Sequence, residues 1–421
     1  MTPASEQRAI ALPGDDKIDT GRKPGATLRI AQVIQSVDAP AGGTSTAFLG
    51  VVGALRAQPG LSVRAFSTPP PAGDPHWGAI EKDRRDFGYA SWTLSAGVGR
   101  YFQTGALGLA VGAAITAGEV DLLHLHGLWC PDLVHSARVA RRASVPVVWQ
   151  PHGMLVGAAI RQKRLKKEVF LATGLRRALC DARAIIYCTR EEQEQSLPPR
   201  AIPRACMHVV PLPLDAPAGL PARAEMQAAA RARFGIPAAA KTVVFMGRLH
   251  PVKRVELAME AVADASRSLP DLHLLLVGDG EAEYVSRLRA LAARLGIAGR
   301  VCFAGFVSGA DKWGALAAGD VLTLNSKHEN FGFVAVEALC VGTLPVMTSN
   351  LALAPELAGV DGGISCEATP HALAAAYVRA IGHPDREGLV SRGQAWVAEH
   401  LSARAVGRSL DGLYRALLTE Q

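Results

Sequence analysis

Short apolar runs alternate with longer amphipathic stretches along most of the chain. In the first half, the runs that predict strands are Leu28–Gln35, Leu61–Phe66, Asp121–His126, Val145–Gln150, Ala184–Cys188 and His208–Pro211. In the second half they are Thr242–Met246, His273–Val277, Val301–Ala304, Val321–Leu324, Leu344–Thr348 and Gly363–Cys366. These runs are nearly continuous Val, Ile and Leu, as expected for parallel strands buried on both faces. Helical stretches such as Val255–Ala265 and Glu281–Leu295 separate them, so we predict two doubly wound α/β domains.

A cluster of prolines marks the boundary between the two halves: Pro211, Pro213, Pro217 and Pro221. Such spacing is typical of a linker. A chain of 421 residues is also comfortable for two domains. We therefore predict a disordered tail over 1–27, a first domain over 28–213, a second over 214–395, and a C-terminal helical segment over 396–421.

The amino-acid composition indicates the class of protein to which this chain belongs. The chain is 49% hydrophobic and 20% charged, which is ordinary for a globular protein. The seven cysteines show no Cys-x-x-Cys spacing, so we interpret them as reduced thiols of a cytoplasmic protein rather than disulfides or zinc ligands. The first 27 residues lack the apolar segment of a signal peptide. The run Ala106–Ala117 is too short to cross a bilayer and is predicted to be a buried helix.

Two glutamates, Glu329 and Glu337, stand with seven residues between them. Glu329 falls in a polar turn, and Glu337 falls in a helical pattern that we expect to begin near Asn330 or Phe331. A helix rises about 1.5 Å per residue, so Glu337 is expected roughly 10 Å along from the turn. Between them a helix N-terminus offers amides to an anion, and Gly332 permits close approach. A carboxylate, free amides and a second carboxylate suit the sugar, diphosphate and ribose of a nucleotide sugar.

A second polar segment, Gly247–Lys253, follows the predicted strand Thr242–Met246. Ligands bind beyond the carboxyl ends of strands in such sheets. Arg248 and Lys253 are five positions apart, and two cations there can hold a diphosphate and stabilise its charge as it leaves. The alternative is a surface ion pair.

The run Glu329-Asn330-Phe331-Gly332, followed by Glu337-Ala338-Leu339, resembles the signature of the family 4 glycosyltransferases, which are retaining enzymes of the GT-B fold. Gly247-Arg248 and Lys253 match the Gly-Arg and Lys-Gly pattern of that family, but Arg254 stands where the family has glycine. The resemblance covers most of 28–415 and is strongest over 243–347. In the first half, His-Gly-Leu-Trp and Pro-His-Gly-Met, followed by basic residues, are similar to bacterial exopolysaccharide and lipopolysaccharide enzymes.

The resemblance implies two Rossmann-like domains facing a cleft, with the last helix crossing back to pack on the first domain. It implies that the second domain binds a GDP- or UDP-sugar, with Glu337 on the ribose and Glu329 on the sugar hydroxyls. The implied donor-binding residues are Gly43, Arg248, Lys253, Glu329, Asn330, Phe331, Gly332, Phe333 and Glu337. Taken alone, the Gly42-Gly43 pair is as consistent with a plain turn before a helix.

The resemblance also implies how transfer occurs. His152, after the strand Val145–Gln150, would lie near C6 of the sugar and the reaction centre. The implied catalytic residues are His152, Glu329, Arg248 and Lys253. The acceptor hydroxyl would attack from the face that the diphosphate leaves, and a phosphate oxygen would take its proton. Configuration is then retained without a protein base, and domain closure would exclude water.

Two further histidines lie in the motif His-Leu-His-Gly-Leu-Trp. His124 and His126 alternate on one strand, so we expect them to face opposite sides, His124 toward the core and His126 toward the acceptor. The chain has no Asp-x-Asp motif and no convincing metal-ligand spacing. We therefore expect no metal and no cofactor, with Arg248 and Lys253 neutralising the diphosphate instead.

The positive charge of the chain is concentrated in its first half. Residues 1–213 hold 25 Lys and Arg against 17 Asp and Glu, whereas the remainder holds 20 against 21. The densest run consists of Arg161, Lys163, Arg164, Lys166 and Lys167. It could contact anionic lipid headgroups at the inner face of the plasma membrane, hold a lipid-linked acceptor, or be a solvated helix face. Nucleic acid is disfavoured because no aromatic residues interleave with these charges.

We therefore predict a retaining hexosyltransferase that acts on a glycan or a lipid-linked saccharide in exopolysaccharide or lipopolysaccharide biosynthesis. Three alternatives remain open at this point. The acceptor could be a small soluble molecule, or the protein could be a sugar-nucleotide 2-epimerase of the same fold. It could also bind a sugar nucleotide without catalysis. Fold alone does not choose among them.

Overall fold

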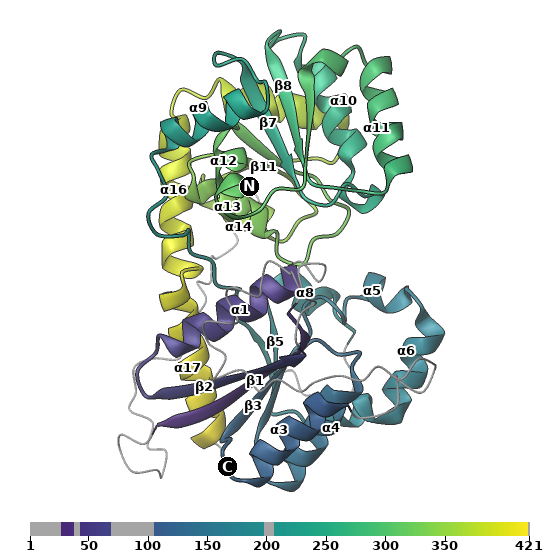
Figure 1. Cartoon of the computed structure of the whole chain (residues 1–421), viewed down its shortest axis with the longest axis vertical. Helices are drawn as coiled ribbons and strands as arrows, with labels where there is room; N and C mark the ends of the chain where they lie inside the picture. Colours follow the sequence, from purple (N-terminus) through teal and green to yellow (C-terminus); the bar gives the residue numbers. More distant parts are fainter. Residues whose placement is uncertain (1–26, 38–42, 69–104, 198–205, 420–421) are drawn as a thin grey trace, which may run out of the picture. The chain divides into compact units, whose positions relative to one another are not determined.

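The computed structural model describes residues 27–37, 43–68, 105–197 and 206–419. The predicted tail over 1–26 and Gly42 lie outside these residues. The chain divides into two compact units (Figure 1). Unit 1 takes the chain up to Pro213 together with Ala403–Gln421, and unit 2 is Leu214–Ser402.

Unit 1 is built on a six-stranded parallel sheet in the order β2-β1-β3-β4-β5-β6. Its strands are β1 (Leu28–Ser36), β2 (Leu61–Thr68), β3 (Leu122–His126), β4 (Val147–Gln150), β5 (Ala184–Tyr187) and β6 (Met207–Val209). Its helices are α1 (Gly43–Arg56), α3 (Ala106–Thr116), α4 (Pro131–Arg142), α5 (Gly157–Arg161), α6 (Arg164–Phe170), α7 (Arg176–Cys180), α8 (Arg190–Gln195) and α17 (Ala403–Thr419). A π-helical turn, Leu171–Leu175, joins α6 to α7.

Unit 2 repeats the plan with the order β12-β11-β10-β7-β8-β9. Its strands are β7 (Lys241–Met246), β8 (Leu272–Val277), β9 (Val301–Gly305), β10 (Val321–Leu324), β11 (Leu344–Thr348) and β12 (Ile364–Cys366). Its helices are α9 (Arg223–Arg233), α10 (Val255–Ala265), α11 (Ala282–Arg294), α12 (Gly309–Ala317), α13 (Phe333–Cys340), α14 (Leu353–Gly359), α15 (Pro370–Ile381) and α16 (Arg386–His400). Each predicted strand therefore overlaps a strand of one of the two sheets.

The strands are apolar because helices cover both faces of each sheet. β5 reads Ala-Ile-Ile-Tyr and is buried at every position, and β10 reads Val-Leu-Thr-Leu and is equally buried. Trp149 and Tyr187 lie in the core of unit 1, and Phe245 and Tyr377 lie in the core of unit 2. The run Ala106–Ala117 forms the half-buried helix α3. No helix in the described ranges is long and apolar enough to cross a membrane.

The C-terminal helical segment predicted over 396–421 falls on two helices, α16 and α17. Helix α16 ends at His400 and α17 begins at Ala403, and the change of unit falls at Ser402 rather than at residue 396. Helix α17 packs beside α1 within unit 1 (Figure 1). A Cβ on Gly407 would meet the carbonyl oxygen of Ala54 at 2.5 Å, so glycine permits this close approach.

Each strand order contains a reversal of winding. In unit 2 the reversal lies between β7 and β10, and in unit 1 it lies between β1 and β3. The loops that follow these strands diverge to opposite faces, which leaves a crevice where ligands bind in doubly wound sheets. The segments Gly247–Lys253 and Asn325–Gly332 follow β7 and β10, so the fold brings the two predicted donor motifs to one edge.

Candidate functional site

In unit 2 the two loops at the switch point are bonded to each other. The amide of Lys327 donates to the carbonyl of Val252 at 2.8 Å. The side chain of Asn325 donates to the carbonyl of Arg254 at 2.6 Å, and Asn325 is fully buried. Tyr377 donates to Thr323, which donates to the amide oxygen of Asn325. The buried core of unit 2 therefore fixes the loop that carries Glu329 against the loop that carries Lys253.

Arg254, where the resembled family has glycine, adopts a left-handed backbone with φ 50° and ψ 49°. This region favours glycine, so the arginine reproduces the turn at a local conformational cost of about 1 kcal/mol. The carbonyl of Arg254 accepts the bond from Asn325, which helps to hold that conformation. The departure from the family pattern thus leaves the turn in place.

Glycines also allow the loop after β7 to approach the loop after β8. A Cβ on Gly278 would meet the carbonyl oxygen of Gly247 at 2.0 Å, and a Cβ on Gly280 would meet that of Leu249 at 2.3 Å. The amide of Leu249 donates to the carbonyl of Asp279 at 2.8 Å. Arg248 projects from this tightly held backbone and is exposed.

Lys253 and Glu329, predicted from separate motifs, form an ion pair. The Nζ of Lys253 lies 2.5 Å from Oε2 of Glu329, and the hydroxyl of Ser326 donates to the same oxygen at 3.1 Å. Both side chains keep partial exposure, at 26% and 20%. The ammonium and the carboxylate are therefore held together and remain reachable by a ligand.

Helix α13 begins at Phe333, two to three residues later than the expected start near Asn330 or Phe331. Gly332 is the reason, because its φ of 88° and ψ of 42° interrupt a right-handed helix. A Cβ there would meet Leu324 at 3.1 Å. Glu329 accordingly lies in the loop, and the free amides at the start of α13 follow directly.

Glu337, inside α13, is held by a lysine that the sequence analysis did not single out. The Nζ of Lys312, from α12, lies 2.5 Å from Oε1 of Glu337, whose side chain is 7% exposed. Lys312 could have been found only as a charged residue in the first turn of an otherwise apolar helix. This pair fixes one carboxylate oxygen of Glu337 and leaves the other for a ligand.

In unit 1 a buried chain of hydrogen bonds joins strands β1, β3 and the loop after β4 to helix α17. Gln32 donates to the hydroxyl of Tyr414 at 3.2 Å, and that hydroxyl lies 2.6 Å from Nδ1 of His124. Nε2 of His126 lies 2.7 Å from the amide oxygen of Gln32, and its Nδ1 lies 2.9 Å from Nε2 of His152. With neutral imidazoles, His126 donates to Gln32 and His152 donates to His126.

The expectation that His124 and His126 face opposite sides is wrong. Their ring centroids are 4.2 Å apart, because residues two positions apart on a strand share a face. Burial lowers the pKa of His124 to about 3 and that of His152 to about 4. Burial, reinforced by its two neighbouring imidazoles, lowers the pKa of His126 well below its ordinary value. All three rings are therefore neutral at pH 7.

His152 lies in a strained turn that a buried glutamate supports. Its φ is 51°, in the left-handed region, and Gly153 follows with φ 77°. Glu192 of α8 accepts a hydrogen bond from the amide of Gly153, and its other oxygen accepts from the amide of Cys188 at 2.8 Å and from the thiol of Cys188. Glu192 is 4% exposed, and burial raises the pKa of its carboxyl. The sequence analysis missed Glu192, since nothing in its acidic helix distinguishes it.

The turn leaves His152 with one imidazole nitrogen uncommitted. Its Nε2–H is bonded to His126, and its Nδ1 has no hydrogen-bond partner within the part of the chain that the structure describes. A neutral imidazole with this tautomer is a hydrogen-bond acceptor at Nδ1. This Nδ1 is itself buried, so it could accept a bond only from a hydroxyl group that reaches it inside the fold.

The remaining predicted residues occupy unit 1 and the start of α13. Gly43 opens α1 after β1, at the same switch point as His126. Phe331 is buried and lies edge-on to Phe333 with ring centroids 5.1 Å apart. Asn330 lies in the loop before Gly332 and is partly buried.

The residues of the basic run differ in their surroundings. Arg161, Lys163, Arg164 and Lys166 are exposed on α5, α6 and the turn between them. Lys167 is instead bonded to the carbonyl of Ala159 at 2.6 Å and lies 5.1 Å from the ring centroid of Trp129. Leu165 is 80% exposed among these cations, and Val169 is 47% exposed one turn later.

Two family models match this chain. "Glycosyl transferases group 1" matches residues 226–387, and "Glycosyl transferase 4-like domain" matches residues 42–213. The two matches fall on the two structural units. The first covers the loops of Lys253 and Glu329, and the second covers Gly43 and all three histidines.

Curated relatives and solved structures agree with these matches. A D-inositol 3-phosphate glycosyltransferase of Mycolicibacterium gilvum is 30% identical over 61% of this chain and 58% of its own length. The enzyme of the same name from Segniliparus rotundus is 26% identical over 72% of this chain and 70% of its own. Anabaena HepE, solved with UDP and glucose, has a TM-score of 0.71 at 23% identity, over 92% of this chain and 100% of its own. WaaG, a glycosyltransferase involved in lipopolysaccharide biosynthesis, has a TM-score of 0.64 at 16% identity, over 91% and 99%.

Proposed function

We propose that this chain, which belongs to the family 4 glycosyltransferases of the GT-B fold, transfers a hexose from a GDP- or UDP-sugar to a glycan or lipid-linked saccharide. The pairing of Lys253 with Glu329 at the switch point of unit 2 carries the proposal. A cation suited to a diphosphate lies directly beside a carboxylate suited to sugar hydroxyls, which supports the proposal.

Unit 2 would bind the donor. Arg248 and Lys253 neutralise the diphosphate, and the amides at Gly332 and Phe333 bind its oxygens at the start of α13. The oxygen of Glu337 that Lys312 leaves uncommitted accepts bonds from the ribose hydroxyls. The structure of HepE with UDP and glucose supports a uridine donor among the candidates.

Unit 1 would supply the group at the reacting sugar and receive the acceptor. His152 would act beside the reacting sugar with a neutral ring, and a sugar hydroxyl would have to enter beside its buried Nδ1 to bond there. The acceptor hydroxyl forms the new bond to the anomeric carbon on the face that the diphosphate leaves, and a phosphate oxygen takes the proton. The anomeric configuration is retained, and Arg248 and Lys253 stabilise the leaving charge without a metal.

The proposal of a lipid-linked acceptor rests on the basic run and on Leu165, which is exposed within it. Four exposed cations surround Leu165, and Val169 extends the apolar surface. Each cation contributes about 1 kcal/mol near an anionic bilayer. This combination supports a lipid-linked acceptor approached at the cytoplasmic face of a membrane in envelope polysaccharide synthesis.

A second acceptor class is supported by the named relatives. Two of them are D-inositol 3-phosphate glycosyltransferases, whose name specifies a small phosphorylated acceptor. The alternative function is therefore transfer to a small soluble acceptor by the same donor site.

The donor is tested first, by thermal unfolding with UDP, GDP and ADP in the presence of EDTA. A ligand that binds the native state raises the melting temperature. We expect one nucleotide to stabilise the wild type and to lose most of that effect in Glu337→Ala. If no nucleotide stabilises the protein, a nucleotide-sugar donor is excluded.

The acceptor is tested next, with the radiolabelled sugar of the nucleotide that binds. Membrane lipid extract and D-inositol 3-phosphate are offered separately. Label in the organic phase supports the lipid-linked acceptor, and label on the inositol phosphate supports the alternative. Free sugar alone, with neither product, would contradict transfer to both acceptors.

A further inference from the structure

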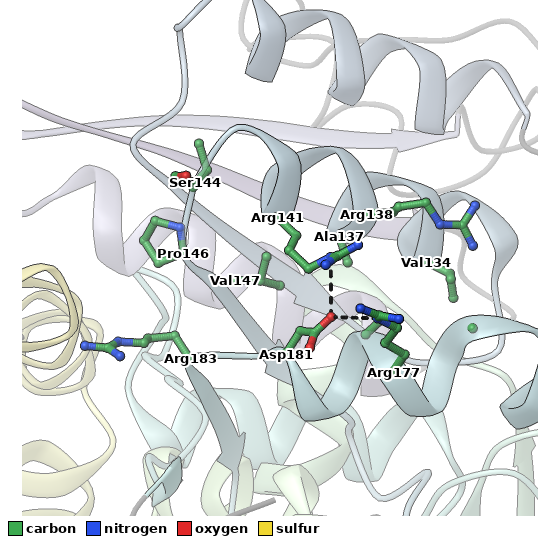
Figure 2. A pocket seen from close by; sticks show the side chains of 13 residues that line it. Val134, Ala137, Arg138, Arg141, Ser144, Pro146, Val147, Arg177, Asp181 and Arg183 are labelled. Atoms are coloured by element: carbon green, nitrogen blue, oxygen red, sulfur yellow. Dashed lines mark ion pairs between the residues drawn. The ribbon is translucent and has the colours of Figure 1, made fainter. Parts of the chain in front are cut away.

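A groove with a volume of about 330 Å³ lies in unit 1 between helices α4 and α7 (Figure 2). It is at the amino ends of two strands, because Val147 begins β4 and Arg183 immediately precedes β5. The amide of Arg183 donates to the carbonyl of Val147 at 2.8 Å, which ties these two edges together. His152 follows the opposite, carboxyl end of β4. The groove is therefore separate from the switch-point residues of the same sheet.

Positive charge dominates the lining of the groove. It contains four arginines and one acidic residue: Arg138, Arg141, Arg177, Arg183 and Asp181. We call this set the arginine groove. Its lining otherwise consists of small and apolar residues of α4, α7 and the start of β4. A concave surface with this composition favours an anion.

The single carboxylate contacts only one nitrogen each of Arg141 and Arg177. Asp181 lies 3.4 Å from Nε of Arg141 and 3.6 Å from Nε of Arg177, so both ion pairs are made through Nε and are long (Figure 2). A guanidinium presents five N–H donors in a planar fork. The terminal amino groups of both arginines therefore remain available for a ligand with several oxygens.

Two more arginines lie on either side of this pair (Figure 2). A Cβ on Gly174 would meet Nη2 of Arg138 at 3.1 Å, and the φ of Gly174 is 126°. The kink at glycine thus leaves space for the guanidinium of Arg138 beside α7. At the other side, Nε of Arg183 donates to the carbonyl of Leu417 at 3.4 Å, which ties this arginine to α17.

We propose that the arginine groove is a second ligand site, distinct from the transfer site, for a compound that carries phosphate groups. Arginine forks match phosphate oxygens in geometry and in charge, and several of them along one groove suit a ligand with two or more such groups. The phosphate could belong to a soluble phosphate ester or to the headgroup of an anionic phospholipid.

A pair of matched double variants tests the proposal. Arg141→Gln with Arg177→Gln removes two charges from the groove. Arg142→Gln with Arg176→Gln removes the same charge from the same two helices, one residue away and outside the lining. Any binding at the donor site or through overall charge is equal in the two variants. Circular dichroism and melting temperature establish that both are folded.

The probes are inorganic pyrophosphate, followed by ³¹P line broadening, and vesicles of phosphatidylcholine with 30% phosphatidylglycerol, followed by sedimentation. We expect the groove variant to lose at least tenfold in affinity for one probe while the control stays within twofold of wild type. Selective loss of pyrophosphate identifies a soluble phosphate compound, and selective loss of vesicles identifies a lipid headgroup. Equal loss in both variants, or no loss for either probe, would overturn the proposal. No outcome depends on transfer activity.

Discussion

Lys312 and Glu337 form a largely buried ion pair that joins α12 to α13, with 2.5 Å between Nζ and Oε1. The glutamate belongs to the predicted donor motif, whereas the lysine lies 25 residues earlier in a different helix. The pair gives the carboxylate of Glu337, whose side chain is 7% exposed, a cationic partner that fixes its position. The donor motif is therefore completed by a residue outside it.

Removing Lys312 should weaken nucleotide binding through Glu337. In Lys312→Met the buried carboxylate loses its partner, so we expect stability to fall by about 1–3 kcal/mol and KM for the donor to rise at least tenfold. Urea unfolding and donor titration measure the two effects. A double-mutant cycle with Glu337→Gln should show that the losses are not additive.

Lys241→Met provides the control, because Lys241 is exposed at the amino end of β7. The predicted donor loop follows the carboxyl end of that strand. It should change neither quantity. If Lys312→Met and Lys241→Met behave alike, Lys312 does not orient Glu337.

Lys253 and Glu329 should act on different parts of the donor. Lys253→Ala removes a cation from the leaving diphosphate, and we expect kcat to fall by about 10²–10³. Glu329→Gln keeps the size of the side chain but loses the charge that holds sugar hydroxyls and Lys253, so we expect both kcat and sugar discrimination to fall. Steady-state transfer with two sugars on the same nucleotide measures these changes. A Glu329→Ala variant with the full transfer rate would remove Glu329 from the mechanism.

The buried histidines should make stability depend on pH. Their pKa values are lower in the folded protein than in the unfolded chain, where a histidine titrates near 6.5. The unfolded chain therefore binds more protons below that pH. The free energy of unfolding should be insensitive to these groups above about pH 7. It should fall by up to about 1.4 kcal/mol per pH unit per histidine as the pH drops from 6.5 toward 4.

Replacing one histidine tests this assignment. His152→Asn should make the decline between pH 6.5 and 4 shallower by one group, as measured by urea unfolding at each pH. An unchanged slope in His152→Asn would show that His152 protonates equally in both states.

Glu192 should position His152 without contacting substrate. Glu192→Gln keeps one acceptor oxygen but disturbs the bonds from Gly153 and Cys188, so the left-handed turn at His152 is less well fixed. We expect kcat to fall at least tenfold while donor KM stays within threefold, and Glu192→Asp to recover less than half of the activity. Steady-state kinetics separate the two parameters.

Glu194→Gln is the matched control, because Glu194 is exposed two residues later on the same helix. It should retain wild-type kinetics. If Glu192→Gln lowers the melting temperature and changes kcat and the donor KM by similar factors, Glu192 has a purely structural role.

The basic run should bind anionic membranes through only part of its length. Replacing Lys163, Arg164 and Lys166 by glutamine should abolish flotation with phosphatidylglycerol vesicles, and Leu165→Ser should reduce it at least threefold. Lys167→Gln should matter less for flotation, because Lys167 is bonded to Ala159. Flotation that survives the triple replacement would remove the membrane contact from the proposal.

The pattern of apolar runs was sufficient to place each strand of the described residues and helices such as α3, α10 and α11. A parallel strand buried on both faces is largely apolar, so β5, β8 and β10 can be recognised from their own residues. The motifs after β7 and β10 could be recognised in the sequence for a related reason. Glycines and charges that directly follow a buried strand fall at the ligand edge of a doubly wound sheet.

Local conformation was less predictable where a single backbone position decides it. Gly332 delays the start of α13, although the apolar pattern begins earlier, because its left-handed backbone interrupts the helix. Arg254 adopts a left-handed turn that its side chain disfavours, and Asn325 bonds its carbonyl. The apolar pattern predicts neither backbone conformation.

The sequence by itself determined the two-domain plan, the strands and the residues that follow them. Only the tertiary structure decided which charges meet. Lys312 reaches Glu337, Glu192 supports the turn at His152, and Tyr414 bonds to Nδ1 of His124, across separations of 25, 39 and 290 residues. Periodicity reports whether a side chain faces a core, but a hydrogen bond or an ion pair depends on distances of a few ångströms. Those distances are set by packing among elements that are remote in the chain.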